Sequence, residues 1–126
     1  MNTDILSFFN DHMDALPLYE RLEGLILEQI PDVKIKVSKT QISFSNKRGF
    51  AFVSFNPCRS AKERPDVWMT VTFGLSYRKE SSRIDAATEP YPNRWTHHIM
   101  VGSDEEIDDE LMSWLREAAE FSASKR

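Results

Sequence analysis

The spacing of the apolar residues changes abruptly at Val33, and this change constrains the fold more than any other feature of the sequence. Before it, residues 17–30 place an apolar side chain at about every third or fourth position, which is the period of an amphipathic helix. After it, residues 33–38 alternate apolar and polar side chains, which is the period of a half-buried strand. The sequence therefore predicts that helix gives way to sheet at this point.

The sequence predicts two helices before the sheet. We expect them at about residues 3–13 and 17–30, with Pro17 in a first turn, where its missing N–H costs nothing, and Pro31 ending the second helix. Inside the second helix, Gly24 costs about 1 kcal/mol relative to alanine unless something packs closely against it.

A third helix is expected after the sheet, at about residues 104–121. Its start resembles a capping box, in which the Ser103 oxygen accepts an amide of the first turn and Glu106 reaches back. Acidic residues crowd the first turns, where the helix dipole favours them. The expected buried stripe consists of Ile107, Leu111, Trp114, Leu115, Ala118 and Phe121.

Residues from about 33 to 101 predict a mostly antiparallel sheet of about five to six strands. Residues 49–55 are apolar on both faces, so we place them centrally. Residues 67–75 alternate most clearly, and residues 96–101 form the last strand. Residues 76–94 have no clear period, and a connection of this length hides a short strand or helix or has a functional role.

These elements fit a single domain spanning residues 1–126, a length that buries enough surface for one core. The expected fold class is α+β: a two-layer sandwich in which the N-terminal helices and the C-terminal helix pack on one face of the sheet. The opposite face is then open. With regular alternation along the strands, it presents Lys34, Lys36 and Trp68.

The sequence favours a cytoplasmic protein of bacterial type. Cys58 is the single cysteine, so the chain forms no internal disulfide, which suits a reducing compartment. The first residues carry acids where a signal peptide needs bases, and no apolar run approaches the ~20 residues that span a bilayer. We therefore expect no membrane partner.

Charge is segregated along the chain. Residues 1–32 carry seven acidic residues and one basic residue, whereas residues 33–94 carry twelve basic and five acidic residues. Residues 95–126 return to eight acidic and three basic residues, within a net charge of −4. Acidic helices therefore flank a basic sheet region.

Several short motifs carry a resemblance to a known family. They lie at residues 37–44, 47–51, 94–99, 108–111 and 114–118, and they include the run Arg94-Trp95-Thr96-His97-His98-Ile99. With these motifs nearly the whole chain resembles an uncharacterised, mainly bacterial family, the domain of unknown function 5655. The resemblance implies a small stand-alone or appended module and implies no activity.

The order of elements carries a second, more distant resemblance. Helices, then strands with a late tryptophan strand, then a helix is similar to the YjbR-like proteins. That similarity implies a frataxin-like two-layer fold, and DNA binding has been supposed for some of those proteins. It rests on layout, so it informs fold more than function.

The first candidate site is the basic middle of the chain. Lysines and arginines supply charge for phosphates, and Trp68 offers a ring for stacking. The structural alternative is that lysines on a half-exposed sheet protect its edges from pairing. The candidate binding residues of this surface are Lys34, Lys36, Lys39, Arg48, Trp68, Arg78 and Arg94.

The second candidate site gathers Arg94, His97 or His98, and Tyr77, with Arg78 and Tyr91 nearby. Neighbouring residues of a strand point to opposite faces, so the two histidines cannot bind one metal ion from the same strand. A cleft with Arg94 and a tyrosine suits a carboxylate or phosphate. The alternative is a buried histidine that pins the long connection to the sheet.

Two weaker candidates have simpler explanations. Cys58 paired with a histidine base is better read as chance placement, because the loop around it matches no nucleophile motif. The acidic cluster of residues 104–110 is explained by helix capping and solvation rather than by a metal. We predict no catalytic residue, no metal and no cofactor.

The sequence therefore favours a non-enzymatic binding or accessory module whose basic surface takes an anionic ligand or nucleic acid. The alternative is a small-ligand pocket or enzyme centred on Arg94, His97 or His98, and Tyr77. A third hypothesis is self-association through Trp68 and the aromatic strand. We expect a monomer or a weak homodimer, and the sequence identifies no physiological partner.

Overall fold

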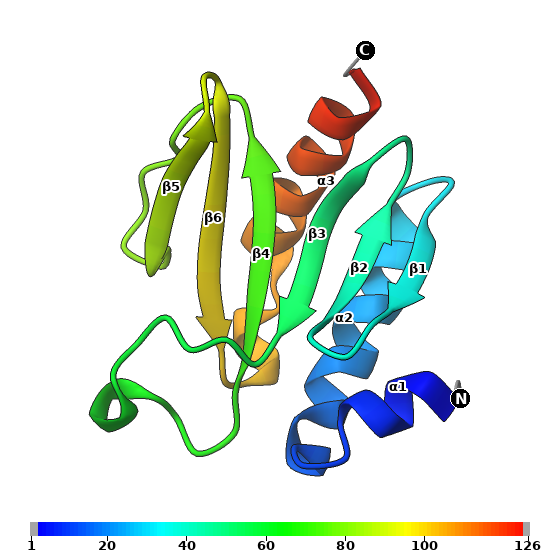
Figure 1. Cartoon of the computed structure of the whole chain (residues 1–126), viewed down its shortest axis with the longest axis vertical. Helices are drawn as coiled ribbons and strands as arrows, with labels where there is room; N and C mark the ends of the chain where they lie inside the picture. The colour runs from blue at the N-terminus through cyan, green and yellow to red at the C-terminus, as the bar shows by residue number, and fades with distance from the viewer. Residues whose placement is uncertain (1–2, 125–126) are drawn as a thin grey trace.

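The computed structural model describes residues 3–124. These residues form three α-helices, three short 3₁₀ helices and six strands (Figure 1). In chain order the elements are α1 (Thr3–Phe8), η1 (Met13–Ala15), α2 (Leu16–Gln29), β1 (Lys34–Val37), β2 (Gln41–Ser45), β3 (Gly49–Ser54), η2 (Ala61–Glu63), β4 (Met69–Leu75), β5 (Ala86–Tyr91), β6 (Arg94–Val101), η3 (Asp104–Glu106) and α3 (Asp109–Ser124).

The strands form one antiparallel sheet in the order β1-β2-β3-β4-β6-β5. Helices α2 and α3 lie side by side behind one face of this sheet, and α1 lies across one end (Figure 1). The α+β two-layer fold predicted from the change of period is thus confirmed. None of the helices in residues 3–124 is long and apolar enough to cross a membrane.

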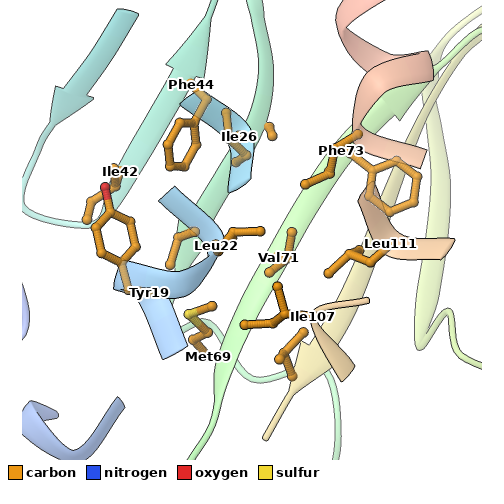
Figure 2. Close-up of a cluster of buried hydrophobic side chains, with 14 of the residues drawn as sticks. Tyr19, Leu22, Ile26, Ile42, Phe44, Met69, Val71, Phe73, Ile107 and Leu111 are labelled. Atoms are coloured by element: carbon orange, nitrogen blue, oxygen red, sulfur yellow. The ribbon is translucent and has the colours of Figure 1, made fainter. Parts of the chain in front are cut away.

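The core lies between the helix layer and the sheet. Tyr19, Leu22 and Ile26 of α2 meet Ile42 and Phe44 of the sheet (Figure 2). On the α3 side, the rings of Phe73 and Trp114 stack with centroids 5.8 Å apart. Burying each large apolar side chain contributes about 1.5–3 kcal/mol, so this layer contact is the main source of stability.

The first helix is shorter than predicted, because it ends at Phe8 rather than near residue 13. After Phe8 the chain turns, and the His12 amide donates to the Phe9 carbonyl at 2.8 Å. The turn buries Phe9 completely, with its ring 5.2 Å from that of Tyr19. Asn10 follows Phe9, and asparagine favours such turns. Helix α2 agrees with its predicted limits to within one residue.

The capping box predicted at Ser103 does not start the last helix. Ser103 makes no side-chain cap bond, and residues 104–106 form the separate turn η3. Asp108 caps α3 instead, because its Oδ1 accepts the Leu111 amide at 3.0 Å. Glu106 does reach back, but it accepts the Gly102 amide at 2.8 Å. The break lets Ile107 point into the core, where it is fully buried (Figure 2).

The long connection predicted at residues 76–94 contains a strand, β5, which pairs with β6 at the edge of the sheet. The turn between β5 and β6 contains Asn93, whose φ of 61° lies in the left-handed region that asparagine tolerates. This tight turn places Tyr91 opposite Arg94.

Candidate functional site

The sheet face opposite the helices is open over its middle, and faces the viewer in Figure 1. The strand register places one row of side chains across it, because directly opposed residues share a face. That row runs Lys36, Ser43, Phe52, Thr72, His98 and Ala86. Only the first of these is charged, so the centre of the open face is neutral and partly aromatic.

A β-bulge shapes one end of this face. Phe44 pairs with Ala51 and Ser45 pairs with Gly49, so Phe50 is an extra residue in β3. Bulges bend their strand. Beyond the bulge, the pairing of β3 with β4 stops at Ala51, and the two strands diverge toward the end where α3 lies behind them (Figure 1).

A hollow of about 190 Å³ lies where the two strands diverge. We call it the Arg94 hollow. Arg94 and Tyr91 border it from the β5–β6 turn, and Phe121 reaches it from α3. Gly74 leaves backbone uncovered there, since a methyl group added to it would meet nothing closer than the Trp95 carbonyl at 3.9 Å. The sheet side chains that line the hollow include Phe52, Thr72 and Thr96 from the open face. Phe73, Leu75 and Trp95 line it from the face that the helices cover.

Arg94 has no polar partner in the described chain. Its guanidinium lies 5.9 Å from the centre of the Phe121 ring, and it makes no hydrogen bond or salt bridge to residues 3–124. Arg59 and Arg83, by contrast, are held by carboxylates at 2.8 Å. Arg94 is a half-buried residue beside a hollow, and its guanidinium has unused N–H donors, so it is able to receive an anion.

His98 extends the polar lining next to the hollow. Its Nδ1 lies 2.8 Å from the Thr72 hydroxyl. Burial lowers the pKa of His98, so the neutral ring is favoured near pH 7. The imidazole therefore offers a neutral hydrogen-bonding edge rather than a second positive charge.

His97 points the other way, into the helix layer, where it is fully buried. Its ring stacks on Phe73 with centroids 4.9 Å apart, and its Nε2 accepts the Lys79 backbone amide at 2.9 Å. Burial lowers the pKa of His97, and the nearby Lys79 charge lowers it further. This geometry agrees with the structural interpretation, in which a buried histidine pins the long connection to the sheet.

Tyr77 does not join Arg94 and His98. Its hydroxyl donates to Glu117 of α3 at 2.5 Å, and the Lys79 ammonium donates to the same carboxylate at 2.8 Å. Burial alone would raise the pKa of Glu117, but these hydrogen bonds lower it below its ordinary value. Tyr77 and His97 thus both lie near Lys79, whereas Arg94 borders a separate hollow that neither of them lines. The predicted cleft of Arg94, a histidine and Tyr77 is therefore not present as one site.

The predicted basic surface is divided into separate parts. Lys34 and Lys36 lie on the edge strand β1, with Lys39 in the turn that follows. Arg94 lies on β6, four strands away, or about 19 Å at the usual strand spacing. Arg48 lies in the β2–β3 turn, and Arg78 is exposed near Glu80, 3.8 Å away.

Trp68 is not a free stacking platform on the open face. It precedes β4, and its ring packs edge-on against Phe55 at 5.7 Å. His12 stacks on the same Phe55 at 3.8 Å, and the Arg64 guanidinium lies 5.7 Å from the Trp68 ring. The prediction placed Trp68 among the open-face residues on the assumption that the alternation of its strand includes it. Strand β4 begins only at Met69, so Trp68 lies outside the alternating segment and packs in an aromatic cluster at the end of the sheet.

Cys58 is not activated as a nucleophile. Burial raises the pKa of its thiol, and the charge of Asp85 raises it further despite the neighbouring Arg59. Within residues 3–124, no three His, Cys, Asp or Glu side chains are arranged to hold a metal ion.

A family model described as Domain of unknown function (DUF5655) matches residues 5–122. The chain belongs to this family. The match confirms the resemblance seen in the sequence motifs of the DUF5655 domain, and the description assigns no activity. No curated protein and no solved structure matches the chain. The more distant resemblance to the YjbR-like proteins therefore stays a prediction.

Sequence reasoning identified Arg94, Tyr91 and His98 of this DUF5655 domain, but it missed Phe52, Thr72, Gly74, Thr96 and Phe121. Phe52 and Thr72 were assigned to strands without a site. The alternation of β4 could have shown that Thr72 and Gly74 share a face, but no sequence signal marks where β3 leaves β4.

Proposed function

We propose that this DUF5655 domain is a non-enzymatic binding module that holds a small anionic ligand in the Arg94 hollow. The observation that carries the proposal is the Arg94 guanidinium, which borders a hollow and makes no polar contact with residues 3–124. An arginine of this kind binds carboxylate or phosphate through paired N–H donors.

The lining narrows the ligand class. Phe52 and Tyr91 supply rings, and Thr72 and Thr96 supply hydroxyl groups. At about 190 Å³, the hollow is smaller than the ~300–1,000 Å³ of pockets for drug-sized ligands. The arrangement suits one anionic group attached to one small planar or apolar group.

Binding without catalysis fits the chemistry of nearby residues better than an enzyme does. His97 is fully buried on the other face with its Nε2 occupied, and the pKa of Cys58 is raised. His98 adjoins the hollow, but its hydrogen bond goes to a threonine rather than to a carboxylate that would orient a base.

A cytoplasmic location is part of this proposal, because a single Cys58 suits a reducing compartment. A bacterial origin, predicted from the resemblance, belongs to it as well.

The proposal is tested by titrating the whole chain with phenyl phosphate and benzoate and following backbone amide resonances by NMR. We expect saturable shifts at Gly74 and Thr96, and we expect Arg94→Gln to lose at least tenfold in affinity, about 1.4 kcal/mol. The affinity of Arg94→Lys should lie between those of the wild type and Arg94→Gln, because lysine keeps the charge but lacks the planar guanidinium group.

Lys36→Gln is the matched control, since it removes one positive charge from the far edge of the same face. It should leave phenyl phosphate binding unchanged. Equal affinity in Arg94→Gln and the wild type contradicts the proposal. Single-stranded DNA serves as a competing probe: tighter binding that requires both Lys36 and Arg94 and falls steeply with salt would favour an extended surface instead.

A further inference from the structure

The strand β1 forms a free edge of the sheet. Among the strands of residues 3–124 it pairs only with β2, and Figure 1 shows no helix or strand beyond its outer side. Such an edge presents a row of backbone donors and acceptors to any strand that approaches.

The register identifies which backbone groups face outward. The Ser38 amide donates to the Gln41 carbonyl at 2.9 Å, so Ser38 and Gln41 of β2 form a hydrogen-bonded pair of the ladder. Hydrogen-bonded and non-bonded pairs alternate along an antiparallel ladder. Lys36 and Lys34 therefore bond to β2, while Ile35 and Val37 direct their N–H and C=O groups away from the sheet.

The side chains of β1 give this edge two chemically distinct faces. Lys34 and Lys36 are exposed on the open face. Ile35 and Val37 are half-buried on the other face and pack with the rim of the core, which includes Phe8. A strand laid beside β1 would meet ammonium groups at alternate positions and apolar groups between them.

A hollow of about 450 Å³ lies next to the end of β1, and Asp4 of α1 is among the residues that line it. It lies between α1 and the β1–β2 turn, and Phe8, Asp11 and Ser38 border it. An extended segment pairing with β1 has room to continue beyond Val37, but Asp4 and Asp11 would repel acidic side chains there, so the acidic positions of such a segment belong beside Lys34 and Lys36.

A second copy of this chain is the less suitable occupant. Antiparallel pairing of two β1 strands would bring lysines opposite lysines, and like charges directly opposed are destabilising. The other edge, β5, is poorly suited to any added strand, because it contains Pro90 and an irregular register between Thr88 and Tyr91.

We propose that the β1 edge binds an extended acidic peptide by strand addition. The peptide alternates acidic residues, which face Lys34 and Lys36, with apolar residues, which face the rim at Ile35 and Val37. Backbone hydrogen bonds to Ile35 and Val37 supply affinity, and the alternation supplies specificity. This site is distinct from the Arg94 hollow and does not depend on it.

The test uses the whole chain and a fluorescein-labelled peptide of four Glu-Val repeats, measured by fluorescence anisotropy at low salt. We expect saturable binding that weakens at least tenfold in Lys34→Glu/Lys36→Glu and weakens as salt rises. Lys47→Glu/Lys62→Glu is the matched control, because it makes the same change of charge at exposed positions outside β1, and it should bind the peptide as the wild type does.

Two further measurements keep the proposal falsifiable if the double variant folds poorly. The same peptide with an N-methyl group at every valine amide cannot donate the hydrogen bonds that antiparallel pairing opposite Ile35 and Val37 requires, so it should bind at least tenfold more weakly. On binding the unmodified peptide, hydrogen exchange at the Ile35 and Val37 amides should slow. Equal binding of the N-methylated peptide, unchanged exchange at these amides, or no binding of the repeat peptide overturns the proposal.

Discussion

At Gly24, a substitution by alanine changes the intrinsic helix propensity without adding a packing contact. It lies in the middle of α2, and a methyl group added to it would meet nothing within 4 Å. Alanine removes the excess flexibility of glycine in the unfolded chain. We expect Gly24→Ala to raise the free energy of unfolding by about 0.5–1 kcal/mol, measured by urea denaturation.

Gly102→Ala is the opposing control. A methyl group there would lie 2.6 Å from Pro65 Cγ and 3.0 Å from the Val67 carbonyl oxygen. This variant should therefore lose stability because the loop before β4 must move. A Gly24→Ala protein no more stable than the wild type would show that α2 has a tight contact at this position.

His98 gives the fold a sensitivity to mild acid. Burial lowers its pKa from the ordinary 6.5, so the unfolded chain binds the proton more readily than the folded chain. The stabilising contribution is therefore complete above pH 6.5 and is lost as the pH falls through the folded pKa. We expect the unfolding free energy of the wild type to fall between about pH 7 and pH 5, and to fall less steeply in His98→Gln.

The measurement is urea denaturation of both proteins at several pH values. His97 contributes a loss in the same direction, because its pKa is also lowered, so some slope should remain in the variant. Asp108 and Glu117 act in a separate, more acidic window, because their pKa values lie below the ordinary 3.8 and 4.5. Identical slopes for the wild type and His98→Gln above pH 5 would contradict the assignment.

At the scale of elements, the periods of the sequence predicted helix and strand identities well and their ends less well. Alternation located the strands, and β5 was foreseen only as one alternative for residues 76–94. Helix ends depend on tertiary contacts that the sequence does not display. The burial of Phe9 shortens α1, and the burial of Ile107 delays the start of α3.

The revised start of α3 leads to a prediction about its cap. Asp108 accepts the Leu111 amide and also binds the Arg83 guanidinium at 3.0 Å. Burial alone would raise the pKa of Asp108, but the Leu111 amide and Arg83 lower it. Asp108→Ala should cost about 1–2 kcal/mol in unfolding free energy, measured by thermal and urea denaturation.

Ser103→Ala tests the discarded capping box and should change stability by less than about 0.5 kcal/mol. Asp108→Asn should recover part of the loss, since an amide oxygen still caps the helix although the charge that pairs with Arg83 is gone. A larger loss of unfolding free energy in Ser103→Ala than in Asp108→Ala would show that Ser103, and not Asp108, caps the helix.

In the molecule as a whole, the packing of helix α3 against the sheet brings together some of the charges that are segregated along the chain. Arg83 of the basic middle binds Glu110 at 2.8 Å, and Lys79 binds Glu117 at 2.8 Å. Both pairs join the connection before β5 to the acidic helix α3. The sequence showed the two charge blocks, but their pairing depends on the path of residues 76–85.

In the candidate site, too, the sequence patterns predicted some of the residues, and the packing of the strands determined the others. Period and resemblance located His98 on the last strand, and strand alternation placed His97 and His98 on opposite faces. Arg94 was selected as a candidate but was expected in the connection before that strand, whereas β6 begins at Arg94. The hollow itself depends on the divergence of β3 from β4 after the bulge at Phe50. No periodicity encodes that divergence, so the lining residues Phe52 and Gly74 emerged only from the fold.

Arg94 borders a hollow at the end of the sheet, between the β5–β6 turn and Phe121 of α3, and its unused N–H donors can bind an anion there. A crystal structure of the whole chain with phenyl phosphate tests this most directly. We expect phosphate oxygens within hydrogen-bond distance of the Arg94 guanidinium and the phenyl ring against Phe52 or Tyr91. Phosphate bound only at the lysines of β1, or an empty hollow at saturating ligand, would contradict it.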